Sequence, residues 1–262
     1  MRDSVEIIAA LRRHVSQLEG LRQTETSGFV GIGHEEIDAR LGGGLERGRV
    51  HEIFALNADD VSSAAGFAAM IVRRAGLGSV VWLRQDNAQG AGGALHMPGI
   101  IELGLRGLDL IVGMLPDALS LLCVAADVTR CADVAMVVVE LWQNPRMLDL
   151  TASRRLAMAA ESSGVTALLL RVAAEPSPSA ATTRWQVRSA AAVPLAANAP
   201  GFPTLDVELS RQRGGKAGGR WCVEWDRDEA IFRPAGYQAA ALSGAVVSVS
   251  AGGPGGARRR AG

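Results

Sequence analysis

The sequence has no excess of either charge, few cysteines and no long hydrophobic run, and each absence excludes a class of protein. Lysine and arginine together number 27, as do aspartate and glutamate, so any basic patch for nucleic acid or membrane must be local. The three cysteines, Cys123, Cys131 and Cys222, lack C-x-x-C spacing. We therefore expect no disulfide framework and no metal site, but reduced, partly buried thiols in a cytoplasm. No apolar run reaches the ~18 residues that span a membrane, and the N-terminus does not resemble a signal peptide.

The composition favours one large α/β domain with tails, since 48% of the 262 residues are hydrophobic. Short β-branched runs alternate with amphipathic segments, which predicts a mostly parallel sheet with helices on both faces. We expect strands at 49–54, 79–83, 108–114, 135–139 and 165–172, and helices at 61–75, 99–104, 117–132 and 149–162. A short helix marked by Ile37, Leu41 and Leu45 precedes the first strand, and the glycines at 42–44 let the chain reverse.

The following region predicts antiparallel structure. Strands are expected at 183–189, 205–211 and 220–226, and the turn GGKAGG joins the last two into a hairpin. The ends of this hairpin carry four cations, Arg211, Arg213, Lys216 and Arg220. They could contact nucleic-acid phosphate or an acidic partner surface, and a solvated turn is the alternative.

Both termini differ in composition from the predicted core at 27–235. Residues 1–26 predict a helix and a linker, and the helix carries an apolar stripe of Val5, Ile8, Leu11, Val15 and Leu18. The stripe can pack on its own domain or dock on a partner, including a second copy of the chain. Residues 236–262 are rich in alanine, glycine and serine, which cannot supply a core and predict disorder.

The segment Val50–Arg73 predicts strand, turn and helix, the place where nucleotide-binding α/β proteins carry a G-x-x-x-x-G-K-[ST] phosphate loop. Here the eight residues are ALNADDVS, without either glycine and without the lysine. Ala55 and Asp60 stand at the two glycines, Val61 stands at the lysine, and Ser62 keeps the hydroxyl position. Asp59 adds a second negative charge. We expect Asp60 to cap the following helix, and we expect no cofactor, no catalytic residue and little ATP turnover. A turn that never bound nucleotide gives the same expectation.

Residues 27–55, SGFVGIGHEEIDARLGGGLERGRVHEIFA, resemble the start of the RecA recombinase core, and the resemblance extends to about residue 230. It places the catalytic glutamate position at Gln85 or Asp86, and the polar sensor position at Arg171 or Val172. The magnesium-site position falls on Glu140, where the predicted strand ends. One carboxylate is too little for Mg²⁺, so we interpret Glu140 as a capping or surface acid.

The degenerate loop, the N-terminal helix and the hairpin LDVELSRQRGGKAGGRWCVEWD together resemble the ImuA family of bacterial damage-inducible mutagenesis proteins. The resemblance implies a non-catalytic accessory role in error-prone translesion DNA synthesis during the DNA-damage (SOS) response. It also implies an ImuB-type polymerase-like partner, an indirect link to a DnaE2-type polymerase and a link to RecA, while direct DNA contact stays open. The alternatives are a RecA-like ATPase or recombination factor and a SulA-like cell-division inhibitor, which is also a RecA-like core without nucleotide chemistry.

Overall fold

The computed structural model describes residues 28–76, 78–86, 93–103, 105, 110–195, 199–216 and 218–236. The predicted N-terminal stripe and the predicted tail beyond Gly236 lie outside these residues. The strands are β1 Phe29–Val30, β2 Leu45–Glu46, β3 Val50–Ala55, β4 Ser79–Gln85, β5 Leu110–Leu115, β6 Val134–Trp142, β7 Thr166–Val172, β8 Thr183–Ser189, β9 Thr204–Gln212, β10 Arg220–Asp226 and β11 Ile231–Pro234. The helices are α2 Glu35–Leu41, α3 Val61–Ala75, α5 Met97–Glu102, α6 Ala118–Thr129 and α7 Leu150–Ser163, with a 3-10 turn η1 at Ala58–Asp60.

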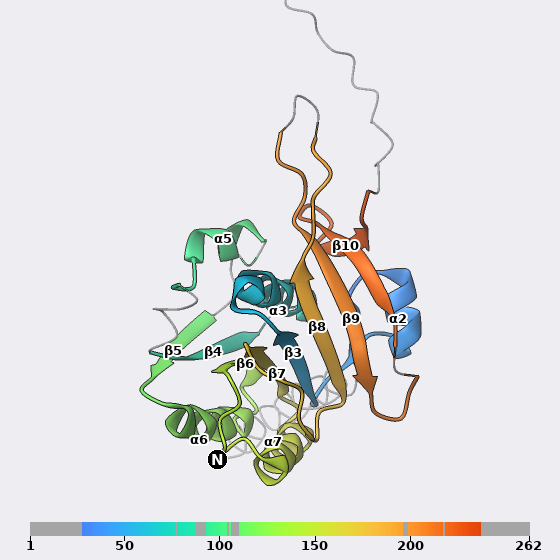
Figure 1. The fold of residues 1–262 in the computed structure, drawn as a ribbon. Helices are drawn as coiled ribbons and strands as arrows, with labels where there is room; N and C mark the ends of the chain where they lie inside the picture. Colours follow the sequence, from blue (N-terminus) through green and yellow to red (C-terminus); the bar gives the residue numbers. More distant parts are fainter. Residues whose placement is uncertain are drawn as a thin grey trace, which may run out of the picture.

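A nine-stranded sheet organises the fold, in the order β11-β10-β9-β8-β3-β7-β6-β4-β5. Strands β8, β3, β7, β6, β4 and β5 pair in parallel, and β9, β10 and β11 extend the sheet antiparallel. Helix α3 covers one face, and α6 and α7 cover the other (Figure 1). The predicted α/β class, with its mostly parallel sheet and its late antiparallel hairpin, is therefore confirmed.

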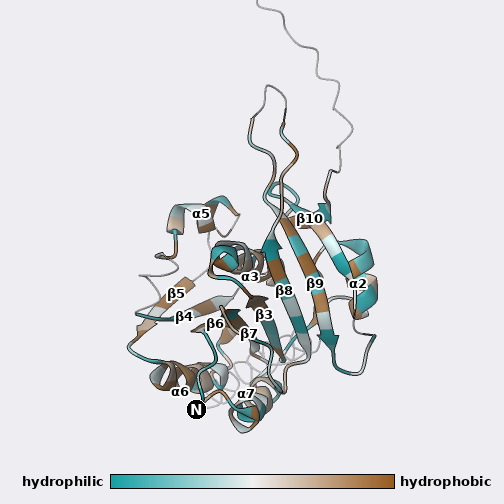
Figure 2. Ribbon diagram, viewed as in Figure 1, coloured by the Kyte–Doolittle hydropathy of each residue, from teal (hydrophilic) through white to brown (hydrophobic). Residues whose placement is uncertain are grey.

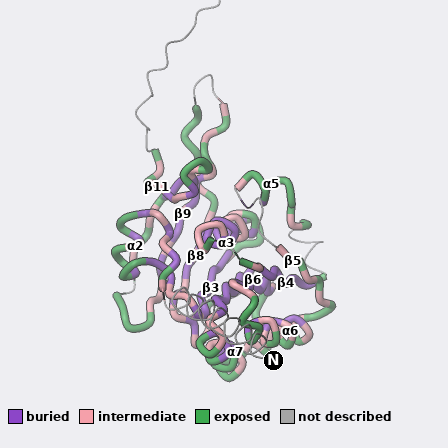
Figure 3. The backbone as a smooth tube through the Cα atoms, turned by 180° about the vertical axis from the view of Figure 1, so that it is seen from behind, coloured by how far each residue is buried: buried purple, intermediate pink, exposed green. Residues whose placement is uncertain are grey.

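The sequence shows how the two faces are filled. The central parallel strands are mostly apolar on both sides, as is typical of strands buried between two layers, and Figure 3 shows their buried residues together. Strands β8 and β9 alternate between hydrophobic and hydrophilic residues along their length (Figure 2). On the α3 face, Phe67 packs against Trp185 and Phe232, with ring centroids 5.8 and 5.4 Å apart. This aromatic contact fixes α3 over the parallel strands and β11 together.

Two helices on the other face begin at aspartates. The carboxylate of Asp117 accepts from Ser120 N at 2.8 Å, and that of Asp149 accepts from Ala152 N at 2.7 Å. Each bond satisfies a backbone donor that the first turn of a helix leaves free. The helix predicted over 117–132 therefore begins one residue later, at Ala118, with Asp117 as its cap.

Several boundaries and exposures differ from the expectations. Leu45 lies in β2 and pairs with Val30 of β1, because α2 already ends at Leu41 and the chain turns back through the glycines. Strand β6 continues to Trp142, so Glu140 lies inside it. The three cysteines, expected to be partly buried, are all exposed. None of the helices in the described ranges is long and apolar enough to cross a membrane.

His51 of β3 belongs to a buried chain of hydrogen bonds on the α3 face. Trp185 Nε1 donates to Thr183 Oγ1 at 3.0 Å, and that hydroxyl lies 2.8 Å from His51 Nδ1. His51 Nε2 lies 2.9 Å from the carbonyl oxygen of Glu46, which can only accept. Nε2 therefore carries the proton, and Nδ1 accepts from Thr183. Burial lowers the pKa of His51 from its ordinary 6.5 to about 4, which matches this neutral state.

Candidate functional site

The turn between β3 and α3 is short and closed. Ala55 is buried at the end of β3, and its carbonyl oxygen accepts from Ala173 N at 2.8 Å. The turn η1 then leads directly into α3, whose second residue, Ser62, is exposed, while Val61 is buried. Ala55, Asp60 and Val61, which replace the two glycines and the lysine of a phosphate loop, are therefore all buried, whereas Asp59 and Ser62 are exposed.

Asp60 stands at the N-cap position of α3, as expected, but its side chain does not cap the helix. Its side chain makes no cap hydrogen bond; instead Oδ1 accepts from Ser189 N at 3.0 Å and lies 3.3 Å from Ser189 Oγ. The reason is the β3–β8 pairing, which brings the end of β8 beside the turn and offers Asp60 a free backbone donor. This carboxylate thus joins the start of α3 to the end of β8.

Glu140 is buried in a salt bridge, so the expectation of a capping or surface acid was wrong. Arg84 of β4 contacts it with two nitrogens, at 2.7 Å from Nε to Oε2 and 3.0 Å from Nη2 to Oε1. The indole nitrogens of Trp82 and Trp142 also donate to Glu140, at 3.4 and 3.1 Å. The two charged side chains are 4% and 1% exposed. A guanidinium therefore neutralises the carboxylate that stands at the magnesium position of the resemblance.

The positions proposed for a catalytic glutamate carry no free buried acid. Gln85 is buried, and its Oε1 lies 3.4 Å from Trp142 N, from which it accepts. Asp86 is exposed, and its backbone N–H donates to the Leu115 carbonyl at 2.8 Å. In the described ranges, no group of three or more His, Cys, Asp or Glu side chains gathers around a point that could hold a metal ion.

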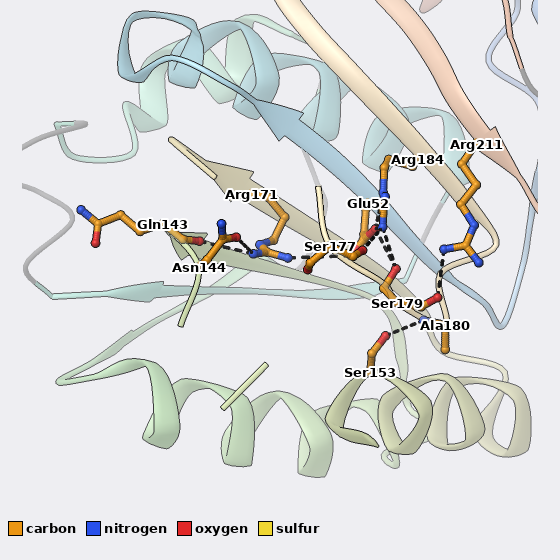
Figure 4. Close-up of polar contacts among 10 residues, drawn as sticks. All are labelled: Glu52, Gln143, Asn144, Ser153, Arg171, Ser177, Ser179, Ala180, Arg184 and Arg211. Atoms are coloured by element: carbon orange, nitrogen blue, oxygen red, sulfur yellow. Dashed lines mark hydrogen bonds and ion pairs between the residues drawn. The ribbon is translucent and has the colours of Figure 1, made fainter. Parts of the chain in front are cut away.

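A second charged cluster lies on the α7 face of the sheet, under the connection from β7 to β8 (Figure 4). Glu52 of β3 accepts from Arg184 Nε at 2.8 Å and from Ser179 Oγ at 2.9 Å. Its other carboxylate oxygen lies 3.8 Å from Arg171 Nη1. The ring of Phe54 contacts both arginines, with each guanidinium carbon 5.4 Å from its centroid.

Arg171, the position that the resemblance gives to a polar sensor, is part of this cluster. Its Nη2 donates to Asn144 Oδ1 at 2.8 Å and to the Gln143 carbonyl at 3.3 Å. The pKa of Arg171 is lowered, mainly by burial and also by the charge of Arg184, while the charge of Glu52 acts in the opposite direction. The side chain therefore holds the 143–144 loop against the sheet.

The four predicted hairpin cations do not form one patch. Arg220 pairs with Asp206, with its Nε 2.7 Å from Oδ1, and this pair lowers the pKa of the Asp206 carboxyl. Arg211 donates to the carbonyl oxygen of Ser179 at 2.9 Å, and Arg211 and Arg213 line one pocket. Lys216 is exposed in the turn. The structure therefore brings Arg211 and Arg213 together with the β7–β8 connection, away from Arg220.

Sequence reasoning missed three members of these ion pairs, the buried Arg84 and Glu52 and the partly buried Arg184. A signal was present, because Glu52, Arg84 and Glu140 interrupt otherwise apolar strand segments. Charged side chains are almost never fully buried without a partner, so such interruptions indicate ion pairs inside the sheet. Which residues pair depends on strand order, which the sequence did not supply.

Comparison with known proteins gives a likeness of fold. No family model matches the sequence, and no curated protein matches it. The crystal structure of the RadB recombinase is similar to this chain, with a TM-score of 0.53 and 14% identity over 79% of this chain and 99% of that one. Together with the sheet described above, this likeness gives the chain a RecA-like fold.

Proposed function

We propose that this protein is a non-catalytic accessory factor of error-prone translesion DNA synthesis in the bacterial DNA-damage response. It would act by contact, bridging RecA-type and polymerase partners, of which the ImuB-type protein is the direct one. The RecA-like fold and the ImuA-like hairpin sequence support this role.

The observation that carries the non-catalytic part is the Glu140–Arg84 pair. In nucleotide hydrolysis, acids at this edge of the sheet work through a metal ion that bridges phosphates. Here the Glu140 carboxylate already accepts two hydrogen bonds from the Arg84 guanidinium and one from each of two indoles. The buried Val61 at the lysine position supports the same conclusion.

A genetic experiment tests the role in mutagenesis. We would measure damage-induced mutation frequency in a strain that lacks the gene, with complementation by the wild type or by Ser62→Ala. Ser62 is exposed, so this change removes the one hydroxyl at a phosphate-loop position with little effect on folding. We expect induced mutagenesis to collapse in the deletion and to return fully with either copy. Normal mutagenesis in the deletion strain would overturn the proposal, and cell length would then test the division-inhibitor alternative.

A biochemical experiment tests the absence of catalysis separately. The purified protein is incubated with ATP and Mg²⁺, with and without single-stranded DNA, beside the Val61→Lys and Ser62→Ala variants. We expect no turnover by any of the three proteins. Hydrolysis by the wild type that Ser62→Ala abolishes would overturn the non-catalytic assignment and favour a RecA-like ATPase.

A further inference from the structure

A pocket of about 490 Å³ lies where α7, the β7–β8 connection and the end of β9 meet. Three arginines line it, one from each of α7 and β9 and one from the turn after β9. Its lining residues are Leu150, Arg154, Pro178, Ser179, Ala180, Arg211 and Arg213. No aspartate or glutamate among the described residues contributes to this lining, so the formal charge of the lining is positive.

The pocket is held in place by the polar contacts shown in Figure 4. Ser153 Oγ accepts from Ala180 N at 2.8 Å, which joins α7 to the β7–β8 connection. Arg211 Nη1 donates to the Ser179 carbonyl at 2.9 Å, which joins β9 to the same connection. Ser179 in turn donates to the buried Glu52. The wall of the pocket is therefore anchored to the core of the sheet.

Two of the three guanidinium groups are available to a ligand. Arg154 and Arg213 are exposed, and no hydrogen bond or ion pair occupies either side chain within the described ranges. Arg211 uses Nη1 for Ser179, which fixes its orientation and leaves its other nitrogens free of any hydrogen bond to a described residue. Three planar forks around one cavity suit carboxylates or phosphates, which they can bind in a bidentate manner.

The shape and the apolar wall favour an acidic protein segment over a nucleic-acid backbone. Phosphates repeat along a nucleic acid, and proteins that bind it carry a basic stripe or groove that follows the chain. Here the arginines converge on one pocket, and Arg220, further along the hairpin, is paired with Asp206. Leu150, 36% exposed, and Pro178 offer an apolar surface beside the cations. A peptide that combines carboxylates with an apolar side chain matches both features.

We propose that this arginine pocket is the docking site for an acidic, partly apolar segment of a protein partner. Carboxylates of the segment contact Arg154, Arg211 and Arg213, and an apolar side chain packs on Leu150 and Pro178. The proposal deepens the accessory function proposed above and rests on it for the existence of a partner, but the binding chemistry is tested without it.

The test uses the full-length protein and a random peptide library displayed on phage. Selection is run in parallel on the wild type, on Arg154→Glu/Arg213→Glu and on the control Arg155→Glu. Arg155 is the neighbouring exposed arginine of α7 and does not line the pocket. We expect the wild type and the control to enrich peptides that combine aspartate or glutamate with leucine, isoleucine or phenylalanine. The double variant should not enrich them.

The most enriched peptide is then labelled with fluorescein, and its affinity is measured by polarisation with each protein. Each single charge reversal at Arg154 or Arg213 should weaken binding about tenfold, which corresponds to about 1.4 kcal/mol, while Arg155→Glu should change it less than twofold. Thermal unfolding of all variants controls for folding. Selection without acidic enrichment, or equal binding by the double variant, would overturn the proposal.

A labelled oligothymidylate provides the competing ligand. Oligonucleotide binding that the double variant loses, without any acidic peptide being selected, would assign the pocket to nucleic acid and overturn the proposal. If the peptide experiments overturn the docking site, the result of the mutagenesis experiment does not change. If the deletion strain shows normal mutagenesis, the result of the peptide selection does not change either. The two hypotheses can therefore fail separately.

Discussion

Removing Arg84 should destabilise the protein strongly, because Glu140 would remain buried without a cation. The change to test is Arg84→Met, which keeps an unbranched apolar stem in place of the arginine stem. Glu140, 1% exposed, would retain only the two indole donors of Trp82 and Trp142. Breaking a buried ion pair by removing one partner costs about 3–5 kcal/mol, which lowers the Tm of a domain of this size by roughly 10 °C.

A second change should recover much of that loss. In Arg84→Met/Glu140→Gln the uncompensated charge is gone, and the amide oxygen of the glutamine can still accept from the indoles. Glu140→Gln alone leaves Arg84 without its carboxylate, but the guanidinium keeps its 2.9 Å hydrogen bond to the Gly93 carbonyl. We therefore expect the single Arg84 variant to be the least stable of the three, with a coupling energy on the order of 2 kcal/mol between the two sites.

The measurement is urea unfolding of the wild type and the three variants, followed by tryptophan fluorescence and by circular dichroism. Arg155→Met serves as the control, because Arg155 is exposed on α7 and its loss should change stability little. A double variant that is no more stable than Arg84→Met would refute the reasoning. So would an Arg84→Met protein whose unfolding midpoint equals that of the control.

Three further predictions concern the strand and turn residues. Stability should fall by about 3 kcal/mol as pH falls from 6.5 to 4, because the unfolded chain binds a proton at His51 in that window while burial keeps the folded histidine neutral; His51→Gln should flatten this part of the pH profile. Asp60→Ala should cost about 1–3 kcal/mol through the lost Ser189 bonds, and Asp59→Ala, an exposed neighbour, almost nothing in the same urea titration. Gly44→Ala should prevent stable folding, because a Cβ at this residue, whose φ is +128°, would clash with the Val30 carbonyl. A Cβ at Gly42 meets open space, so Gly42→Ala adds only the backbone strain of a φ of +78°. Soluble yield and Tm of the two variants test this difference.

The fold could be predicted largely from the sequence because its signals are local. Apolar runs, helical periodicity and turn residues placed α3 at 61–75 and β8 at 183–189, and both bounds agree with the structure. The boundary at Glu140 failed because a charged residue inside an apolar run looks like the end of a strand. The pairing of β1 with β2 also escaped prediction, since each strand has only two residues, too few to show alternation.

The charged clusters could not be predicted because they depend on which strands are neighbours. Arg84 and Glu140 stand directly opposite each other in the β4–β6 register, although 56 residues separate them in sequence. Glu52 and Arg184 stand opposite each other in the β3–β8 register, separated by 132 residues. A shift of one residue in either register would turn one partner to the other face of the sheet. Each of these ion pairs therefore helps to specify the register of the two strands that it joins.

The proposal that this RecA-like fold acts by contact rather than by chemistry draws on where its charged side chains are paired. On the α3 face, Glu140 is neutralised by Arg84, and Asp60 is engaged with Ser189. On the α7 face, Glu52 is neutralised by Arg171 and Arg184 in the core. These buried glutamates are thus paired with arginines, whereas the side chains of Arg154 and Arg213 of the pocket beside α7 have no hydrogen-bond or ion-pair partner among the described residues. Both of these guanidinium groups are exposed, so substitutions of Arg154 and Arg213 should impair partner binding without changing stability.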